Sequence, residues 1–512
     1  MRTSLPPACA ALLMLACVFT FGCSGGAPFG AGARSKPVTT PPSTPTSPTS
    51  PTTTTTTTSP SSPSSPSDPS TPTAYVSVMI SDPAACKAPN GKFSHVYITI
   101  ADVQASTNPD AAAGDSSFVD LTPGLSSAPQ QVDLLGQPNS KCFLSSLSVS
   151  QQVLTGNYQQ IRIFLAPDSA ASSVQNNACG ASYSNCLVLN DNSLHDLALP
   201  AASAKGIELS TAQLVGGGLS VSAGDQPAID LNFDICSSIL AAANGGYEFN
   251  PIMYAGLIPS TGGSISGQVV SSETGNALKG GQVVVALEQK DSKTGIDRIL
   301  MRTVANSAGN FVLCPVPQGT YDVVALGVDG SNVSYSAGVE TGIQNGQMAG
   351  KIPLVPGTTQ GTLNGMVTTQ NASLPPAGIP VAVQASALEQ IAGGTTITVP
   401  LLPSQSLYNS AMLTANNGSC PAGVDCSSFA LQLPAVAPNV VACSADTAPF
   451  KQEQGTAPTY IAESFAQIPG SGNIPDCISS DLSVSSTLQG HSIVLNPDQN
   501  STASTLAFTR CE

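Results

Sequence analysis

The chain has 512 residues, of which 41% are hydrophobic and only 9% charged, and its 16 basic and 31 acidic residues give a net charge of −15. Ordinary soluble domains carry about 25% charged residues, so neutral side chains must supply the wet surface here, as is typical of exported β-proteins. The chain has no cluster of Lys and Arg, which excludes nucleic acid as a partner and argues against docking on anionic lipid. The length predicts roughly two to four domains.

An apolar run, Leu12–Phe21, follows Arg2 and ends in Gly22-Cys23-Ser24. A short hydrophobic segment after a positive residue, closed by small residues, has the layout of an export signal. The run is shorter than the ~20 residues that a membrane-spanning helix needs, which disfavours an uncleaved anchor. We predict that residues 1–22 are a signal peptide of the lipoprotein type, and an ordinary secretory signal cleaved nearby is the alternative.

The lipoprotein prediction depends on Thr20-Phe21-Gly22-Cys23, which resembles a bacterial lipobox. Gly22 fits the pattern, whereas Thr20 and Phe21 depart from the usual Leu and small residue. The resemblance implies that Cys23 takes lipid after cleavage and holds the mature chain to a membrane. Ser24 implies delivery to the outer membrane, so we expect an exported protein of the bacterial cell envelope that faces the periplasm or the surface.

Pro, Ser and Thr dominate the residues that follow, as in Thr52–Thr58 and Ser59-Pro60-Ser61-Ser62-Pro63. Pro fixes φ and lacks a backbone donor, so such tracts favour extended polyproline II at ~3.1 Å per residue. We predict that residues 23–73 form a disordered tether that lifts the folded part off the lipid surface, either glycosylated on its hydroxyls or bare.

The 14 Cys residues include three in or at the end of the signal segment, which leaves 11 for the exported part. In an oxidising compartment most of these would pair, and an odd number leaves at least one free. Close spacing predicts two loop disulfides, Cys179–Cys186 and Cys420–Cys426. The three His residues are scattered, so we expect no structural metal and no cofactor.

Short strands are predicted from Ala74 onward, where apolar and polar residues alternate and many side chains are β-branched or aromatic. The clearest candidates are residues 75–80, 93–100, 118–121, 131–135, 159–165 and 228–233, which are separated by turn residues. No long segment with helical periodicity intervenes. The pattern predicts an all-β chain and an antiparallel β-sandwich over residues 74–259.

Four segments of this region, in one order, resemble a domain of unknown function that recurs in bacterial envelope lipoproteins. They are Val78-Met79-Ile80-Ser81-Asp82, residues 95–103, Val132-Asp133-Leu134-Leu135 and residues 156–163, and residues 230–239 match its closing element. The resemblance covers residues 73–259. It implies a β-sandwich and an exported context, and it brings no known ligand.

Arg162 and Asp133 are the charged residues of this domain that could contact a ligand as a pair. The favoured alternative is a structural ion pair, or an Arg162 on the wet face of a strand whose Ile161 and Ile163 face inward. The loop over residues 190–196 offers oxygens that could bind calcium. It lacks the Gly and the terminal Glu of a calcium loop, so a turn rich in Asn and Asp is the favoured interpretation.

Gly-rich turns separate a further set of short strands, at residues 264–270, 281–287, 309–313 and 316–325. Their order resembles the carboxypeptidase regulatory-like domain, a transthyretin-type sandwich also grouped with carbohydrate-binding-like folds, over residues 263–356. Phe311 and Leu313 should alternate into the core, and Gly319 should permit a tight turn. Tyr321 should bury its ring while its hydroxyl finds a partner.

This unit repeats with a shift of 98, because residues 361–367 echo residues 263–269 and later segments follow in the same order. We predict a diverged second sandwich of this kind over residues 361–512, with the Cys420–Cys426 loop as an insertion. An unrelated β-domain whose Gly spacing coincides is the alternative. In this alignment Cys314 lies opposite Gln432, so Cys314 is the candidate for the unpaired thiol.

The motifs of serine hydrolases and zinc proteases are absent from the sequence, and Gly346–Ile352 is one residue short of a phosphate loop and lacks its Ser or Thr. We therefore expect no catalytic residue and no enzyme. The favoured hypothesis is a structural or adhesive lipoprotein that recognises an envelope protein.

The alternative is a module that binds envelope or extracellular polysaccharide, which follows from fold analogy alone. Sugar recognition stacks rings on aromatic side chains, and the chain has no Trp. The stacking would fall to the tyrosines in loop-like settings, although local packing is the favoured interpretation for each of them: Tyr183, Tyr335, Tyr408 and Tyr460.

Overall fold

A computed structural model describes residues 72–82, 91–199, 204–241, 245–258, 263–278, 280–292, 294–369, 381–403, 410–413, 420, 426–443, 449–453, 457–468, 477–480 and 492–508. Nearly all regular structure in these residues is β, which confirms the predicted fold class. Residues 73–512 belong to one compact unit of the chain. Within the described residues, no helix is long and apolar enough to cross a membrane.

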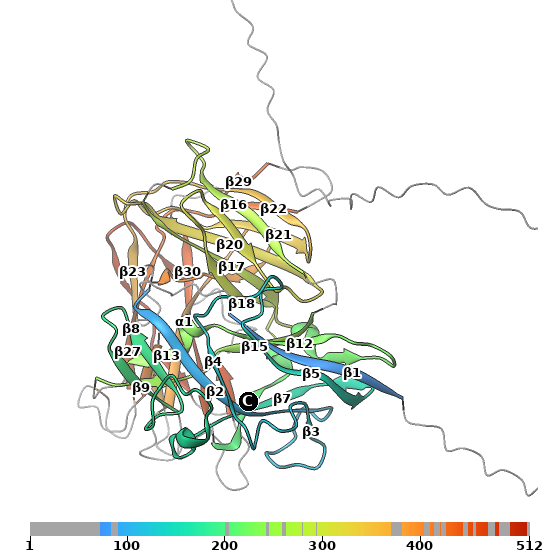
Figure 1. Ribbon diagram of the computed structural model, residues 1–512. Helices are drawn as coiled ribbons and strands as arrows, with labels where there is room; N and C mark the ends of the chain where they lie inside the picture. The colour runs from blue at the N-terminus through green and yellow to red at the C-terminus, as the bar shows by residue number, and fades with distance from the viewer. Residues whose placement is uncertain are drawn as a thin grey trace, which may run out of the picture. The chain divides into compact units, whose positions relative to one another are not determined.

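The first sandwich contains β1 to β15 (Figure 1). One sheet has the order β15-β12-β1-β5, and the other runs β10-β7-β2-β8-β9-β14-β13 with β3 and β4 also paired to β2. The bounds are β1 Thr73–Ser81, β2 Phe93–Ser106, β3 Val119–Asp120, β4 Gln130–Asp133, β5 Ser145–Leu154, β6 Gly156–Tyr158, β7 Gln160–Leu165, β8 Cys186–Leu189, β9 Leu194–Ala198, β10 Ile207–Leu209, β11 Leu219–Val221, β12 Ala228–Phe233, β13 Ile239–Ala241, β14 Tyr247–Phe249 and β15 Met253–Ile258. Short helical turns lie between them: η1 Asp168–Ser173, η3 Thr211–Gln213, η4 Val215–Gly217 and α1 Ile235–Ser238.

The core of the first sandwich forms from residues that alternate along facing strands. Val76, Val78 and Ile80 of β1 and Val96 and Ile98 of β2 are at most 1% exposed and belong to one buried cluster. Side chains two apart on a strand share a face, so the residues between them point away from this core. β2 therefore has one face that is buried in this core and one face that points outward.

The second sandwich has one sheet of order β19-β16-β22 and a second in which β21-β20-β17-β18 lie side by side. The bounds are β16 Ile265–Ser271, β17 Gln282–Lys290, β18 Ile296–Val304, β19 Asn310–Leu313, β20 Thr320–Val328, β21 Gly338–Gln344 and β22 Met348–Leu354. Phe311 and Leu313 are buried in its core, as expected. The ring of Tyr321 is 1% exposed, and its hydroxyl donates to the Pro317 carbonyl at 2.9 Å, so both parts of that prediction are confirmed.

The third sandwich follows the same order. Its sheets contain β27-β23-β33 and β31-β30-β24-β25, and β26, β32 and β34 pair at the side. The bounds are β23 Gly361–Thr369, β24 Val381–Gln390, β25 Thr396–Thr398, β26 Ser410–Leu413, β27 Cys426–Leu433, β28 Asn439–Ala442, β29 Lys451–Gln452, β30 Thr459–Ile468, β31 Cys477–Ser480, β32 Ile493–Val494, β33 Asn500–Thr502 and β34 Leu506–Phe508.

A glycine–phenylalanine pair recurs in the second and third sandwiches. Gly267 lies directly opposite Phe311 in the pairing of β16 with β19, and Gly365 lies directly opposite Phe429 in the pairing of β23 with β27. In both pairs the Phe ring fills the space that a β-carbon on the glycine would need. The two sandwiches thus share a strand order and a cross-strand contact at corresponding positions.

The sheets are mainly antiparallel, as predicted, and each sandwich also pairs its first strand in parallel with a late one. β1 pairs parallel to β12, β16 to β22, and β23 to β33 and β34. A parallel pair needs a long crossover connection, which the intervening strands supply. Local alternation in the sequence cannot reveal this pairing, because it joins residues far apart in the chain.

The second and third sandwiches are joined through a continuous sheet. β18 pairs parallel to β25 at Ile296↔Thr396 and Asp297↔Ile397, so the strand order runs without a break from β21 of one sandwich to β31 of the other. Val284 and Leu326 of the second sandwich also belong to the buried cluster of the third.

The first and second sandwiches are joined by a buried ion pair and a disulfide. Arg302 of β18 donates to Asp234 Oδ2 at 2.6 Å, and both side chains are at most 8% exposed. Cys142 is bonded to Cys314 across 172 positions. The prediction that Cys314 is the unpaired thiol is therefore wrong. Cys142 precedes β5 and Cys314 follows β19, so only the contact between two sandwiches brings them together.

Candidate functional site

The outer face of β2 carries a group of partly exposed polar rings and charges. Val96 and Ile98 point into the core, so His95 and Tyr97 point outward. Tyr97 lies directly opposite Asp133 of β4. The alternation of one strand thus brings an imidazole, a phenol and a carboxylate to one surface.

The three side chains contact one another. His95 Nδ1 lies 2.7 Å from Asp133 Oδ2, and the two side chains are 44% and 21% exposed. The rings of His95 and Tyr97 stack at 13° with centroids 5.5 Å apart. The Val96 and Leu135 amides donate to Asp133 Oδ1 at 3.3 and 3.1 Å, so the backbone fixes the direction of the carboxylate.

Tyr97 keeps its proton over the physiological range. Burial, and then the negative charge of Asp133, raise the pKa of the Tyr97 phenol above 10.0. A neutral phenol both donates and accepts a hydrogen bond. The cluster can therefore offer a partner a hydroxyl, an imidazole and a fixed carboxylate.

Aliphatic side chains extend the same surface. Val188 of β8 lies opposite His95, and Leu194 of β9 lies opposite Val188 and is 43% exposed. Side chains directly opposite each other on neighbouring strands share a face. We call the surface of His95, Tyr97, Asp133, Val188 and Leu194 the His95 face; it combines polar groups with apolar area, as protein-binding surfaces do.

A disulfide-bonded loop borders the His95 face. Cys179 is bonded to Cys186, at the pair that the spacing predicted. Gln131 of β4 donates to Asn177 Oδ1 at 2.9 Å, and the Thr99 hydroxyl donates to the Ser184 carbonyl at 2.6 Å. The loop thus covers the neighbouring part of the sheet and leaves the His95 face beside it.

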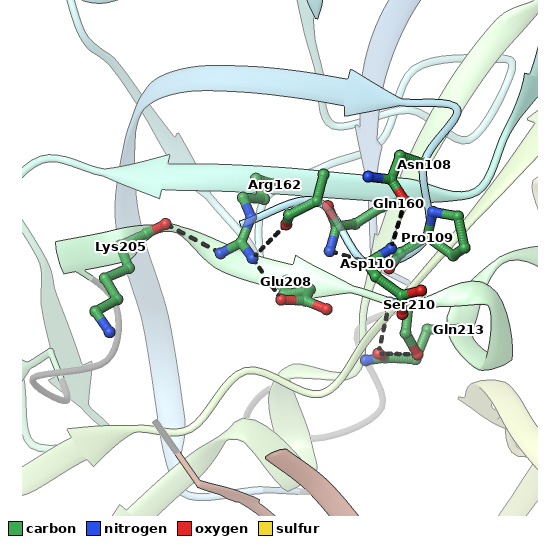
Figure 2. Close-up of polar contacts among 10 residues, drawn as sticks. Asn108, Pro109, Asp110, Gln160, Arg162, Lys205, Glu208, Ser210 and Gln213 are labelled. Carbon is green, nitrogen blue, oxygen red and sulfur yellow. Dashed lines mark hydrogen bonds and ion pairs between the residues drawn. The ribbon is translucent and has the colours of Figure 1, made fainter. Parts of the chain in front are cut away.

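Arg162 and Asp133 do not meet, so they are not a ligand-binding pair. Arg162 Nη2 donates to Glu208 Oε2 at 2.6 Å and to the Ala111 carbonyl at 3.2 Å, and Nη1 donates to the Lys205 carbonyl at 3.3 Å (Figure 2). The Arg162 side chain is 3% exposed and lies 5.7 Å from the centroid of the Phe118 ring. Arg162 is therefore neither a wet-face residue nor a ligand contact, but a buried structural cation.

Neighbouring residues in Figure 2 extend this structural role to the loops around Arg162. Gln160 Nε2 donates to the Pro109 carbonyl at 3.4 Å, and the Ser210 amide donates to Gln213 Oε1 at 3.2 Å. The Asp110 amide donates to Asn108 Oδ1 at 3.1 Å. These hydrogen bonds of the polar groups hold two loops against β7.

Two of the four tyrosines that sugar stacking would need are buried, which agrees with the favoured interpretation of local packing. Tyr335 is 8% exposed and packs in the core of the second sandwich. Tyr460 is 1% exposed, and its hydroxyl donates to the Pro434 carbonyl at 2.9 Å. Neither ring can lie flat on a sugar. Tyr183 is half-buried in the Cys179–Cys186 loop, and Tyr408 lies outside the described residues.

The remaining predicted positions are a disulfide, a lipidation site and a loop. Cys420 is bonded to Cys426, again at the predicted pair, and Cys23 lies outside the described residues. In the loop over residues 190–196 the Ser193 amide donates to Asp191 Oδ1 at 2.9 Å, which is the favoured Asx turn. No group of three or more metal-ligating side chains occurs in the part of the chain that the structure describes.

The His95 face was missed from the sequence, although a signal was present. His95 and Tyr97 are two residues apart and alternate with the apolar Val96 and Ile98. The period of two alone therefore places both on one outer face. Their contact with Asp133 joins β2 to β4, which are separated in the chain by β3 and its flanking loops. That contact required the pairing of the two strands.

The fold and the site define an all-β protein of tandem sandwiches with a polar cluster on an outer sheet face. Residues 73–251 match the family model described as "Domain of unknown function (DUF4382)". No curated protein matches the chain.

Solved structures give only distant likenesses. A leucine-rich repeat protein from Bacteroides thetaiotaomicron is 14% identical with a TM-score of 0.20, over 49% of this chain and 27% of that one. The Bacillus anthracis TIE protein is 9% identical with a TM-score of 0.14, over 86% and 51%. A DUF3823 family protein from Bacteroides uniformis is 10% identical with a TM-score of 0.13, over 43% and 96%. The chain thus spans about a quarter and about half of the first two proteins.

Proposed function

We propose that the chain is an exported, lipid-tethered and non-catalytic protein of the bacterial cell envelope, which binds a protein partner through its first sandwich. The export signal, the lipobox-like Thr20-Phe21-Gly22-Cys23 and the Ser/Thr/Pro-rich residues after it support the tether. The disulfides support an oxidising compartment, because thiols are kept reduced in the cytosol.

The observation that carries the binding role is the half-exposed cluster of His95, Tyr97 and Asp133. By contrast, Arg162 of this domain and Arg302 at its junction with the second sandwich are buried in ion pairs. The His95 face instead presents oriented polar groups next to exposed aliphatic area, and binding surfaces combine such anchors with a polar rim. Polysaccharide is the weaker candidate, since Tyr335 and Tyr460 are buried.

The tether is tested by feeding cells a labelled fatty acid. The wild-type chain and a Cys17→Ala control should incorporate the label and sediment with membranes, whereas Cys23→Ala should lose both properties. Cys17 is matched because it lies in the same apolar run but would be removed with the signal. Unchanged labelling of Cys23→Ala would exclude the lipid.

The binding surface is tested by site-specific photo-crosslinking in the native envelope. A photoreactive phenylalanine at position 97 should yield a discrete protein adduct, and Asp133→Asn or His95→Ala in the same chain should weaken it. Position 149 on β5 is the matched control, because Val149 is 81% exposed and lies on the other sheet. No adduct at position 97, or the same adduct from position 149, would contradict the proposal.

A further inference from the structure

Three acidic side chains lie buried where the third sandwich covers the second. Glu288 of β17 is fully buried, Asp297 of β18 is 4% exposed, and Asp322 of β20 is half-buried. We call Glu288, Asp297 and Asp322 the carboxyl seam. Carboxylates are rarely buried without a partner, because the charged form loses its hydration.

The third sandwich contacts this seam directly. The Thr398 amide of β25 donates to Glu288 Oε2 at 3.1 Å, and the Thr398 hydroxyl donates to the Asp297 carbonyl at 2.7 Å. Asp297 also lies opposite Ile397 in the parallel pairing of β18 with β25. The acids therefore lie at the point where the continuous sheet passes from one sandwich to the other.

The seam residues point to one face of the sheet. Glu288 lies directly opposite Asp322, and Lys290, two residues further along β17, lies opposite Asp297. Asp297 and Asp322 lie close enough for the charge of Asp322 to raise the pKa of Asp297. The other oxygen of Glu288, Oε1, has no hydrogen-bond partner among the described residues.

The cations around the seam cannot neutralise all three acids. Lys290 is exposed and lies near Asp297 and Asp322. Arg298 of β18 lies near Glu288 but is ion-paired with the buried Glu463 of β30. The Gly342 amide of β21 donates to Asp322 Oδ1 at 2.9 Å and brings no full charge.

The same continuous sheet carries further buried acids. Glu340 of β21 and Glu389 of β24 are 3% and 2% exposed. If every carboxyl group at this junction were ionised, negative charges would outnumber the positive charges that face them. Such like charges repel strongly in a buried environment.

Burial sets the protonation of the seam. Burial, and then the charge of Asp322, raise the pKa of Asp297 to about 7. Burial raises the pKa of Glu288 well above its ordinary value, and it also raises that of Asp322. The proton of Asp297 is therefore present in mild acid and is lost in mild alkali.

We propose that the carboxyl seam is a proton-operated joint, which holds the third sandwich on the second while it is protonated and loosens when it ionises. A carboxyl group whose pKa is raised on folding stabilises the folded junction fully below its unfolded value, near 4. That contribution is lost as the pH rises through the folded value. For Asp297 this stabilising contribution is lost between pH 3.8 and about pH 7.

Hydrogen exchange of the full chain tests the joint. Peptides that cover Ile296–Val304 and Thr396–Thr398 are followed by mass spectrometry from about pH 5 to about pH 9, with exposure times scaled to the intrinsic exchange rate. If the junction releases one proton when it opens, its equilibrium constant for opening rises about tenfold per pH unit. We expect protection of these peptides to fall by about tenfold or more between about pH 6 and about pH 8. The β2 peptides are followed in Asp230→Asn, which removes the pH dependence that Asp230 gives the first sandwich, and they should change less.

Variants of single acids distinguish the pH dependence of the carboxyl seam from a general change in stability. Glu288→Gln and Asp297→Asn keep the shape and the hydrogen-bonding groups but cannot ionise, so each should flatten the pH dependence of the seam peptides. Asp230→Asn, which removes a buried acid from the first sandwich, should leave that dependence intact. If Glu288→Gln does not fold, Asp297→Asn and the wild-type profile decide the question. Equal protection at both ends of the pH range, or a fall parallel to that of β2, would overturn the proposal.

Discussion

Arg162 and His95 each lie beside a carboxylate, but burial gives them different roles. The Arg162 side chain is 3% exposed and bonds to Glu208 and to two backbone carbonyls. The His95 side chain is 44% exposed and rests on Tyr97. A buried cation whose Nη1 and Nη2 groups bond to the fold is not available to a ligand, whereas an exposed imidazole is.

Replacement of Arg162 by Met should therefore be costly. It removes the cation that compensates Glu208, and breaking a buried pair from one side costs about 3–5 kcal/mol of unfolding free energy. His95→Ala should change that free energy by no more than about 1 kcal/mol, because its pair with Asp133 is exposed. Chemical denaturation of both variants measures the difference. Equal small effects would show that Arg162 is not a structural cation.

Asp230 of β12 should make the stability of the first sandwich depend on pH. Its side chain is 1% exposed, and burial raises its pKa from 3.8 to about 8, although the Ser81 hydroxyl donates to it. A raised pKa stabilises the fold fully below about 4 and loses that contribution up to about 8. Denaturation from about pH 5 to about pH 8 should show a decline that Asp230→Asn reduces. An identical decline in the variant would rule Asp230 out as its source.

At the scale of elements, the cross-strand contact of Gly267 with Phe311 positions β16 against β19. A β-carbon at Gly267 would lie 2.8 Å from the Phe311 ring, well inside van der Waals contact. The ring thus occupies the space that the glycine leaves. The same contact of Gly365 with Phe429 holds β23 against β27.

Gly267→Ala should destabilise the second sandwich by about 1–3 kcal/mol, because an added methyl overpacks a filled core. The double variant with Phe311→Leu should recover part of this loss, since a smaller side chain frees the space. Gly156→Ala is the matched control: its added carbon would meet nothing closer than Thr107 at 3.4 Å. Thermal unfolding distinguishes them. The steric explanation fails if Gly267→Ala and Gly156→Ala shift the transition equally.

The sequence predicted the strands better than it predicted which strands pair with one another. Strands with apolar alternation, such as β1 and β12, were found within a few residues of their bounds. β5 was missed because its residues are mainly Ser and Gln, which fit turns as well as strands. The pairing of β18 with β25 and the ion pair of Arg162 with Glu208 join distant positions, and single-strand periodicity carries no information about such contacts.

At the scale of the whole molecule, contacts between sandwiches matter as much as the sandwiches themselves. The first and second are joined by Arg302 with Asp234 and by Cys142–Cys314, and the second and third by the pairing of β18 with β25. These contacts would let the folded part present the His95 face from a fixed base. A disulfide that closes a long loop typically adds about 2–5 kcal/mol.

Peptide mapping without reduction tests this account most directly, when it is applied to the full chain recovered from the cells that make it, with free thiols blocked at lysis. We predict a linked pair of peptides that contains Cys142 and Cys314, together with the loop disulfides Cys179–Cys186 and Cys420–Cys426. This result requires both an oxidising compartment and contact between the first two sandwiches. Recovery of Cys142 and Cys314 as blocked free thiols would contradict the account.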